Sequence, residues 1–340
     1  MRKLRVLVLM HDYLVPPADI GDQDPLTAPW RTEYDVLTTV RDQLEHDVHV
    51  LGVKDDLAGI RQANDEFKPH IAFNLMEAFH EVGTFDQNVV AYLELLRLSY
   101  TGSNPRGMLL SRDKALSKKL LHYHRIAVPE FTVVRRGRKP RLPARFKLPV
   151  IVKSLTQEAS IGISQASVIE DEAKLRERVE FIHDSVTTDA IIEEYIEGRE
   201  LYVAVLGNQR LQAFPIWEMT FANMPDDQHR IATGRVKWNA KYQKRMGIAT
   251  GLADLPPEMA DRIQHVAKRV YQVLELSGYA RIDLRLTPDG RVYVLEANPN
   301  PQIARKEDFA EAAARAGVDY PALLQRILSI GMRWEPERLG

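Results

Sequence analysis

Short apolar runs alternate with amphipathic stretches over the first part of the chain. Three runs have the length of buried strands, at residues 5–10, 48–53 and 71–75. Three stretches have helical periodicity, at residues 32–44, 57–67 and 86–98. Such alternation is typical of a doubly wound, parallel α/β layer. Thr32 and Asp35 resemble a capping box, which predicts that the first helix begins at Thr32.

The pattern changes after residue 105, where Pro105 and Gly107 interrupt the chain. We expect Ser111 to cap a helix that reaches about His124. Further strands are predicted at residues 148–153 and 190–194, and further helices at 170–183, 257–276 and 308–331. The helix at 257–276 is expected to pack as core, and the tail at 308–331 to close the C-terminal domain. We therefore predict three units, residues 1–105, 106–194 and 195–340.

Two alternating arms near the C-terminus flank Asp289-Gly290, a dipeptide that favours a two-residue hairpin turn. With that turn, Asp283 lies opposite Glu296, and Arg281 lies opposite Asn298. Facing carboxylates are destabilising unless a cation lies between them, and two carboxylates with an amide oxygen suit Mg²⁺. A four-residue loop would instead pair Arg281 with Glu296 in a salt bridge without metal. The residues alone leave both alternatives open, although both keep the four side chains on one face.

Charge and composition narrow the classes of function. The 46 basic and 47 acidic residues give a net charge of -1, so we expect neither nucleic acid nor a membrane as a partner. Absence of cysteine excludes thiol catalysis and cysteine-ligated metals. The short apolar run near the N-terminus lacks the length of a signal sequence, so we expect a cytoplasmic protein. Neither G-x-G-x-x-G nor a P-loop motif occurs.

Three further charged features can be interpreted either as ordinary solvent-exposed charge or as part of a functional site. Residues 135–147 hold seven basic residues and no acidic one, and we interpret them as a solvated loop whose role the sequence leaves open. Lys153 ends an apolar run, as the solvated end of a strand or as a charge near a phosphate. Glu193 and Glu200 flank a strand-to-turn segment and suit ordinary surface charge.

Several short stretches carry a family resemblance through their order and spacing. They are Tyr92-Leu-Glu-Leu-Leu, Tyr100-Thr-Gly-Ser, Arg112-Asp-Lys-Ala, Pro149-Val-Ile-Val-Lys, Ala159-Ser-Ile-Gly, Ile192-Glu-Glu-Tyr-Ile-Glu-Gly-Arg-Glu, Ala240-Lys-Tyr, Gly278-Tyr-Ala-Arg-Ile-Asp and Leu295-Glu-Ala-Asn. Together they resemble the D-alanine–D-alanine ligase-like branch of the ATP-grasp superfamily over nearly the whole chain. The resemblance implies an α/β fold of ATP-grasp architecture, with an N-terminal doubly wound domain followed by central and C-terminal α+β lobes.

The resemblance also implies a reaction and a set of site residues. In that family ATP phosphorylates a carboxylate, and an amine attacks the acyl phosphate to give an amide, ADP and phosphate. The implied cofactors are ATP and two Mg²⁺ ions, with Mn²⁺ as an alternative. The implied nucleotide-binding residues are Lys114, Lys153, Glu193 for the adenine amino group, Glu194, Ile196, Glu200 for the ribose, and Lys241 for the transferring phosphate. The implied metal ligands are Asp283, Glu296 and Asn298. The implied catalytic residues are Arg281, which polarises the acyl phosphate, and a hydrogen-bonded Glu33, Ser160 and Tyr242 that orient the first amino acid.

The segment after Asn298 departs from the family pattern. The ligases have a serine there that grips the carboxylate of the second D-alanine, whereas Glu307 falls near that position here. An acid repels a carboxylate, and we expect Arg305 and Lys306 to compensate. We therefore expect a carboxylate–amine ligase that acts on amino acids or a small peptide other than two D-alanines. The alternatives are D-alanine–D-alanine ligase itself and a non-catalytic nucleotide-binding regulatory protein, and the family suggests a homodimer.

Overall fold

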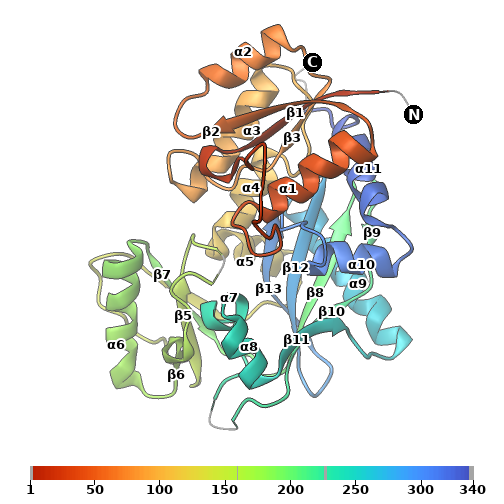
Figure 1. Cartoon of the computed structure of the whole chain (residues 1–340). Helices are drawn as coiled ribbons and strands as arrows, with labels where there is room; N and C mark the ends of the chain where they lie inside the picture. The colour runs from red at the N-terminus through yellow and green to blue at the C-terminus, as the bar shows by residue number, and fades with distance from the viewer. Residues whose placement is uncertain (1–2, 159, 226–227, 337–340) are drawn as a thin grey trace.

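The computed structural model describes residues 3–158, 160–225 and 228–336, and three sheets organise it (Figure 1). The N-terminal sheet is parallel, in the order β2-β1-β3. Its strands are β1 (Arg5–His11), β2 (Asp47–Val53) and β3 (Ile71–Asn74). β1 is central and fully buried from Val6 to Met10, as a continuous apolar run requires. The three predicted strands and the doubly wound arrangement are confirmed.

The first five helices include those that pack on this sheet and, last in the series, one that packs instead against the C-terminal core and the central sheet. They are α1 (Arg31–Thr38), α2 (Ala58–Glu66), α3 (Asp86–Leu95), α4 (Pro105–Arg112) and α5 (Lys114–Tyr123). The predicted capping box is wrong, because α1 begins at Arg31 and the Thr32 hydroxyl accepts from Gln302, a residue far along the chain. Ser111 is also not a cap. It lies inside α4, and Asp113 caps α5 by accepting from two backbone N–H groups.

The central sheet is antiparallel, in the order β4-β7-β5-β6. Its strands are β4 (Phe131–Val134), β5 (Val150–Ser154), β6 (Val168–Ile169) and β7 (Ala190–Glu194). The helix α6 (Glu172–Phe181) packs on the face that carries Val150, Val152 and Ile192. Because side chains alternate along strands, Lys153 and Glu193 lie on the opposite face. This face, the one not covered by α6, is directed toward the C-terminal sheet (Figure 1).

The C-terminal sheet has the order β11-β10-β8-β12-β13, with β9 paired to β8. Its strands are β8 (Arg199–Leu206), β9 (Gln212–Ala213), β10 (Trp217–Phe221), β11 (Ile248–Leu252), β12 (Tyr279–Leu286) and β13 (Val292–Pro299). One face packs on α9 (Pro257–Val273), which confirms that this helix is core. The remaining helices are α7 (Gly234–Trp238), α8 (Ala240–Met246), α10 (Asp308–Arg315) and α11 (Tyr320–Gly331).

The hairpin of β12 and β13 confirms the predicted facing pairs but not the predicted turn. Asp283 pairs with Glu296, and Arg281 pairs with Asn298. The turn has three residues, 288–290, because Thr287 N–H bonds to the Arg291 carbonyl and Leu286 pairs with Val292. A β-bulge between Asp283 and Leu284 then inserts Leu295 as an extra residue on β13. The bulge restores the register that a two-residue turn would have given.

The C-terminal tail returns to the N-terminal sheet, contrary to the expectation that it closes only the C-terminal domain. Leu323, Leu324 and Ile327 of α11 pack in one core with Val6 and Val8 of β1. α10 instead packs on the C-terminal sheet through Phe309, whose ring meets Phe214 and Tyr279 edge-on. The tail therefore connects the N-terminal sheet with the C-terminal sheet (Figure 1). Within the described residues, no helix is both long enough and apolar enough to cross a membrane.

Phe309 tests this packing. It is 1 % exposed, so Phe309→Ala leaves a cavity between α10 and the sheet. We expect the free energy of unfolding, measured by urea denaturation, to fall by about 3–5 kcal/mol. The matched control is Phe85→Ala, which removes a ring that is 42 % exposed. Equal losses in the two variants would contradict the packing described here.

Candidate active site

Four of the expected site residues lie side by side on one face of the C-terminal hairpin. Arg281 donates to both oxygens of Asp283, from Nε at 2.8 Å and from Nη2 at 2.9 Å. Glu296 and Asn298 occupy the facing positions on β13. The Arg281 guanidinium also lies over the Tyr202 ring, 4.8 Å from its centroid. Strand alternation and the bulge therefore bring two carboxylates, an amide and a guanidinium together.

Neighbouring cations influence the ionisation state of the two carboxylates. Burial alone would raise the pKa of Glu296, but Lys114, Lys237, Lys153 and Arg281 together lower it to about 2. The Lys114 Nζ lies 3.8 Å from Glu296 Oε2. Burial raises the pKa of Asp283, and the opposing effect of Arg281 does not fully offset it. Glu296 is therefore the firmly ionised member of the pair, the state that a metal ligand requires.

The central sheet contributes a buried cluster of one acid and two lysines. Lys153 Nζ lies 2.9 Å from Glu193 Oε2, and Lys118 Nζ lies 3.1 Å from Glu193 Oε1. Burial alone would raise the pKa of Glu193, but the two ammonium groups outweigh it and lower the pKa to about 2. Glu193 is 1 % exposed, so it is not ordinary surface charge. In this structure its carboxylate faces lysines.

Glu200 is likewise buried and bound within the protein. Its oxygens accept from Arg285 Nη2 at 2.8 Å and from the Tyr202 hydroxyl at 2.9 Å. The segment at residues 228–233 lies over the same region, where Arg285 Nη1 donates to the Arg230 carbonyl at 3.0 Å. Ile231 of this segment packs on Ile151 and Val168, on the face of the central sheet that carries Lys153.

The nearby residues Glu194 and Ile196 keep their expected position beside Glu193. Glu194 ends β7 and is half-buried, and Ile196 follows it and is buried. Lys241 differs, because it lies exposed on α8. The lysine whose charge acts on both Asp283 and Glu296 is Lys237, on the preceding helix α7. Lys237 therefore contributes to the electrostatics of both carboxylates, and a role for the exposed Lys241 stays a prediction.

Glu33, Ser160 and Tyr242 do not form the expected hydrogen-bonded set. The Ser160 hydroxyl donates to the Ala232 carbonyl at 2.7 Å, and the Tyr242 hydroxyl donates to Gln228 Oε1 at 3.5 Å. Both hydroxyls thus bind the 228–233 segment. Glu33 is buried in α1, where burial, with a smaller contribution from a neighbouring carboxylate, raises its pKa to about 7. Ala159, which opens the Ser160 motif, lies outside the described residues.

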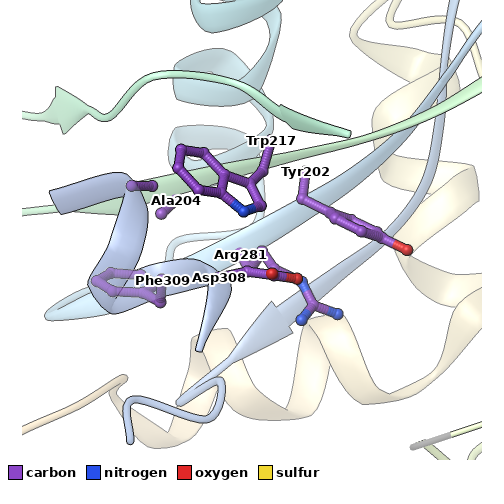
Figure 2. Close-up of a pocket in the computed structure, with 7 residues that line it drawn as sticks. Tyr202, Ala204, Trp217, Arg281, Asp308 and Phe309 are labelled. Carbon is purple, nitrogen blue, oxygen red and sulfur yellow. The ribbon is translucent and has the colours of Figure 1, made fainter. Parts of the chain in front are cut away.

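A small cavity, too tight to hold a water molecule, lies beside Arg281, between the C-terminal sheet and α10 (Figure 2). Its walls are Tyr202, Ala204, Trp217, Arg281, Asp308, Phe309 and Ala312. Aromatic rings therefore surround the side chain that is expected to polarise the acyl group, and Asp308 gives the cavity an acidic edge. The Asp308 carboxylate accepts from the Thr250 hydroxyl at 2.7 Å.

Glu307, next to this cavity, is compensated by a different cation from those expected. Arg31 Nη1 lies 3.0 Å from Glu307 Oε1. Arg305 points toward α1 instead, where its backbone N–H donates to Asp35 at 2.9 Å and its Nη2 donates to Thr39 at 2.7 Å. Arg305 therefore does not pair with Glu307 as expected, and the expectation for Lys306 stays a prediction. The segment after Asn298 is held against α1, which places an N-terminal element at the site.

Sequence reasoning missed three cations that the structure places here. Lys118 follows Lys114 by one helical turn, so the two lysines share a helix face. Arg285 lies two residues after Asp283 and four after Arg281 on β12, so its side chain is expected on the same face of the strand. Lys237 precedes Lys241 by four residues, and nothing in the sequence distinguished the two. Periodicity could therefore have found Lys118 and Arg285 but not Lys237.

Structural comparison identifies the fold. The chain superimposes on D-alanine–D-alanine ligase from Bacillus anthracis with a TM-score of 0.76 and 24% identity, over 97% of this chain and 98% of that one. It also superimposes on the VanG D-Ala:D-Ser ligase of Enterococcus faecalis with a TM-score of 0.70 and 17% identity, over 97% and 100% of the two chains. At these identities the likeness shows the fold, which is the α/β ATP-grasp fold of these ligases.

Sequence comparison then gives the family. Residues 120–329 match the family described as D-ala D-ala ligase C-terminus. A D-alanine–D-alanine ligase from Desulfotalea psychrophila is 31% identical over 82% of this chain and 84% of its own length. An uncharacterised protein of Sinorhizobium fredii is 32% identical over 77% of this chain and 75% of its own. The chain belongs to the D-alanine–D-alanine ligase family, and it is an ATP-dependent, ADP-forming carboxylate–amine ligase.

Glu193→Gln tests the buried cluster, because it leaves Lys118 and Lys153 without their shared carboxylate. We expect the free energy of unfolding near neutral pH to fall by about 3 kcal/mol. The pKa of Glu193 is lowered from 4.5 to about 2 in the folded protein, so the contribution of the carboxylate is present above pH 4.5 and is lost as the pH falls toward 2.

Urea titrations at about pH 7 and about pH 3 measure this effect. The difference between wild type and Glu193→Gln should be smaller at the lower pH. Glu197→Gln, at an exposed position on the same segment, is the control and should change little at either pH. A gap between wild type and Glu193→Gln that does not depend on pH would contradict the role of the ionised carboxylate.

Proposed function

We propose that this ligase activates a donor carboxylate as an acyl phosphate and joins it to an amine acceptor that differs from D-alanine. The observation that carries the proposal is the Asp283–Glu296 pair on neighbouring strands, with Arg281 beside it and Lys114, Lys153 and Lys237 acting on it. Phosphoryl transfer depends on positioning and on neutralising charge on the phosphate oxygens, and such a site supplies both.

The residues present suit Mg²⁺. Glu296 is held ionised, and the two carboxylates and the Asn298 amide oxygen, on neighbouring strands, are hard ligands. Among the described residues no group of three acidic or histidine side chains converges, so the set needs Asn298 as its third member. We propose that Asp283, Glu296 and Asn298 hold two Mg²⁺ ions, with Mn²⁺ as a substitute. When bound, such ions neutralise charge on the transferring phosphate.

The lysines and Arg281 then have separate tasks in this proposal. Lys114 and Lys153 bind ATP phosphates from the side of the central sheet. Lys237 takes the place by the transferring phosphate that the family resemblance assigned to Lys241. Arg281, held by Asp283 in a two-bond fork, points its guanidinium at the acyl carbonyl. It stabilises the negative charge that develops on that oxygen when the amine attacks.

The acceptor side supports an acceptor other than D-alanine. By the resemblance, Glu307 falls near the position where the ligases grip the acceptor carboxylate with a serine, and Arg31, the nearby cation, is already paired with Glu307 rather than left to bind a substrate carboxylate. Asp308 adds a second acid at the cavity beside Arg281. A carboxylate brought to this edge would meet two acids, which disfavours an α-amino acid bound in the family's orientation. We propose an amine acceptor whose end near Glu307 is neutral or cationic.

A substrate screen tests the proposal. Purified protein is incubated with ATP, Mg²⁺ and pairs of carboxylates and amines, and ADP release is read together with product mass. We expect amide formation with at least one pair and none with D-alanine alone. A D-alanyl-D-alanine product would make the chain an ordinary member of its family. ATP binding without ADP release for any pair would favour a regulatory protein.

Glu296→Gln tests the metal site in the same assay, or by ATP hydrolysis if no acceptor is yet known. Loss of the ionised ligand should reduce kcat by about 100-fold or more, because charge on the phosphate is no longer neutralised. Asp289→Asn, at the exposed turn of the same hairpin, should leave kcat unchanged. A Glu296→Gln enzyme with normal magnesium-dependent turnover would exclude Glu296 as a ligand.

A further inference from the structure

Lys118 is a charged side chain that lies almost wholly inside the protein. It is 1 % exposed on α5, one helical turn after Lys114. Its Nζ lies 3.1 Å from Glu193 Oε1 and donates to the Leu295 carbonyl at 2.5 Å. An ammonium group is costly to bury unless it is paired and hydrogen-bonded, so these two contacts hold it in one place.

The two partners of Lys118 belong to different sheets. Glu193 lies on β7 of the central sheet, and Leu295 lies on β13 of the C-terminal sheet. Leu295 is the extra residue of the β-bulge, which disturbs the hydrogen-bond ladder at that position. Lys118 binds the carbonyl at this disturbance. One ammonium group, carried by a helix outside both sheets, therefore ties them together.

Both contacts lead directly to residues of the site. The other oxygen of Glu193 binds Lys153 at 2.9 Å, and the residue after Leu295 is Glu296. We propose that Lys118 is a positioning residue that sets the spacing between Lys153 and Glu296. It acts through Glu193 and the bulge, and it touches neither the nucleotide nor the metal. The inference rests on the proposed function, in which Lys153 and Glu296 act on the phosphates of one ATP.

Lys118→Met tests this proposal, because methionine keeps an unbranched side chain and removes the ammonium. The measurement is ATP binding by isothermal titration calorimetry in the presence of Mg²⁺, without a carboxylate or amine substrate. We expect the Kd for ATP to rise about tenfold or more, as is typical when a group that orients a ligand-binding residue is lost. Lys119→Met is the matched control, since Lys119 is the exposed neighbour on the same helix, and its Kd should stay at the wild-type value.

A purely structural role gives a different result. In that case Lys118→Met lowers the thermal midpoint, but the folded protein binds ATP with unchanged Kd, and this outcome overturns the proposal. Should Lys118→Met fail to fold, Lys118→Arg replaces it. Its charge is kept but its longer, planar head cannot reproduce the spacing, so the Kd should rise about fivefold or more. An Arg variant that binds ATP like wild type also overturns the proposal.

Chemical rescue gives an independent readout, because the chain contains no cysteine. Lys118→Cys can be alkylated in denaturant with 2-bromoethylamine, which forms a thioether, releases bromide and restores an ammonium at nearly the lysine length. After refolding, we expect ATP binding to return toward wild type only in the alkylated protein. Lys119→Cys, treated in parallel, controls for the chemistry. Equal ATP binding with and without alkylation at position 118 overturns the proposal.

These outcomes are separate from the outcome of the substrate screen. ATP binding needs neither donor nor acceptor, so a chain that forms no amide still answers the question about Lys118. Conversely, normal amide formation together with a Lys118→Met protein of unchanged Kd would leave the proposed function standing and remove only this inference.

Discussion

The structure is constrained by two carboxylates that face each other across neighbouring strands. Asp283 and Glu296 repel at this spacing, and both lie against the protein interior. Such a pair persists only where cations surround it. Arg281 comes from the same strand as Asp283, Lys114 from α5, Lys153 from the central sheet and Lys237 from α7. Cationic side chains from separate parts of the chain therefore surround this pair.

This convergence explains how a chain with a net charge of -1 can hold a polyanionic nucleotide. The total charge conceals a local arrangement in which buried and half-buried cations face a few buried or half-buried acids. Buried charges interact more strongly than exposed ones and are less screened by salt. The Glu193 cluster follows the same logic, since one carboxylate holds two lysines of the central region. The cationic side chains are thus held in fixed positions by their acidic partners before a ligand binds.

Sequence patterns predicted the N-terminal strands, β5, β7, the C-terminal hairpin and most of the long helices, because apolar periodicity reports burial directly. They did not predict β4, β6, β8, β9, β10 or β11, nor the break between α10 and α11. The facing of Asp283 and Glu296 was also predicted, although through a two-residue turn that the structure does not have. The three-residue turn and the bulge at Leu295 compensate each other, and neither has a local signal in the sequence. Such compensation depends on long-range contacts, here the Lys118 bond to the Leu295 carbonyl.

Where sequence reasoning failed, a distant partner decided the outcome. Thr32 contacts Gln302 instead of capping its helix, and Glu307 is matched by Arg31 rather than by Arg305. Ser160 and Tyr242 bind the 228–233 segment, and the charge of Lys237, which the sequence analysis did not single out, acts on the carboxylates. Most of these contacts join residues that are far apart in the sequence. In the case of Lys237 and Lys241, the local sequence pattern does not show which lysine acts on the carboxylates. The resemblance supplied the class of chemistry, and the structure supplied the partners.

We propose above that Asp283, Glu296 and Asn298 form the metal site of this ligase. Crystals grown with ADP and Mn²⁺ test it directly through anomalous diffraction at the manganese edge. We expect an anomalous peak within about 2.0–2.4 Å of Glu296 and of at least one of the other two residues. A peak bound only by other residues, or a nucleotide bound at the lysines with no manganese at this hairpin, would contradict it.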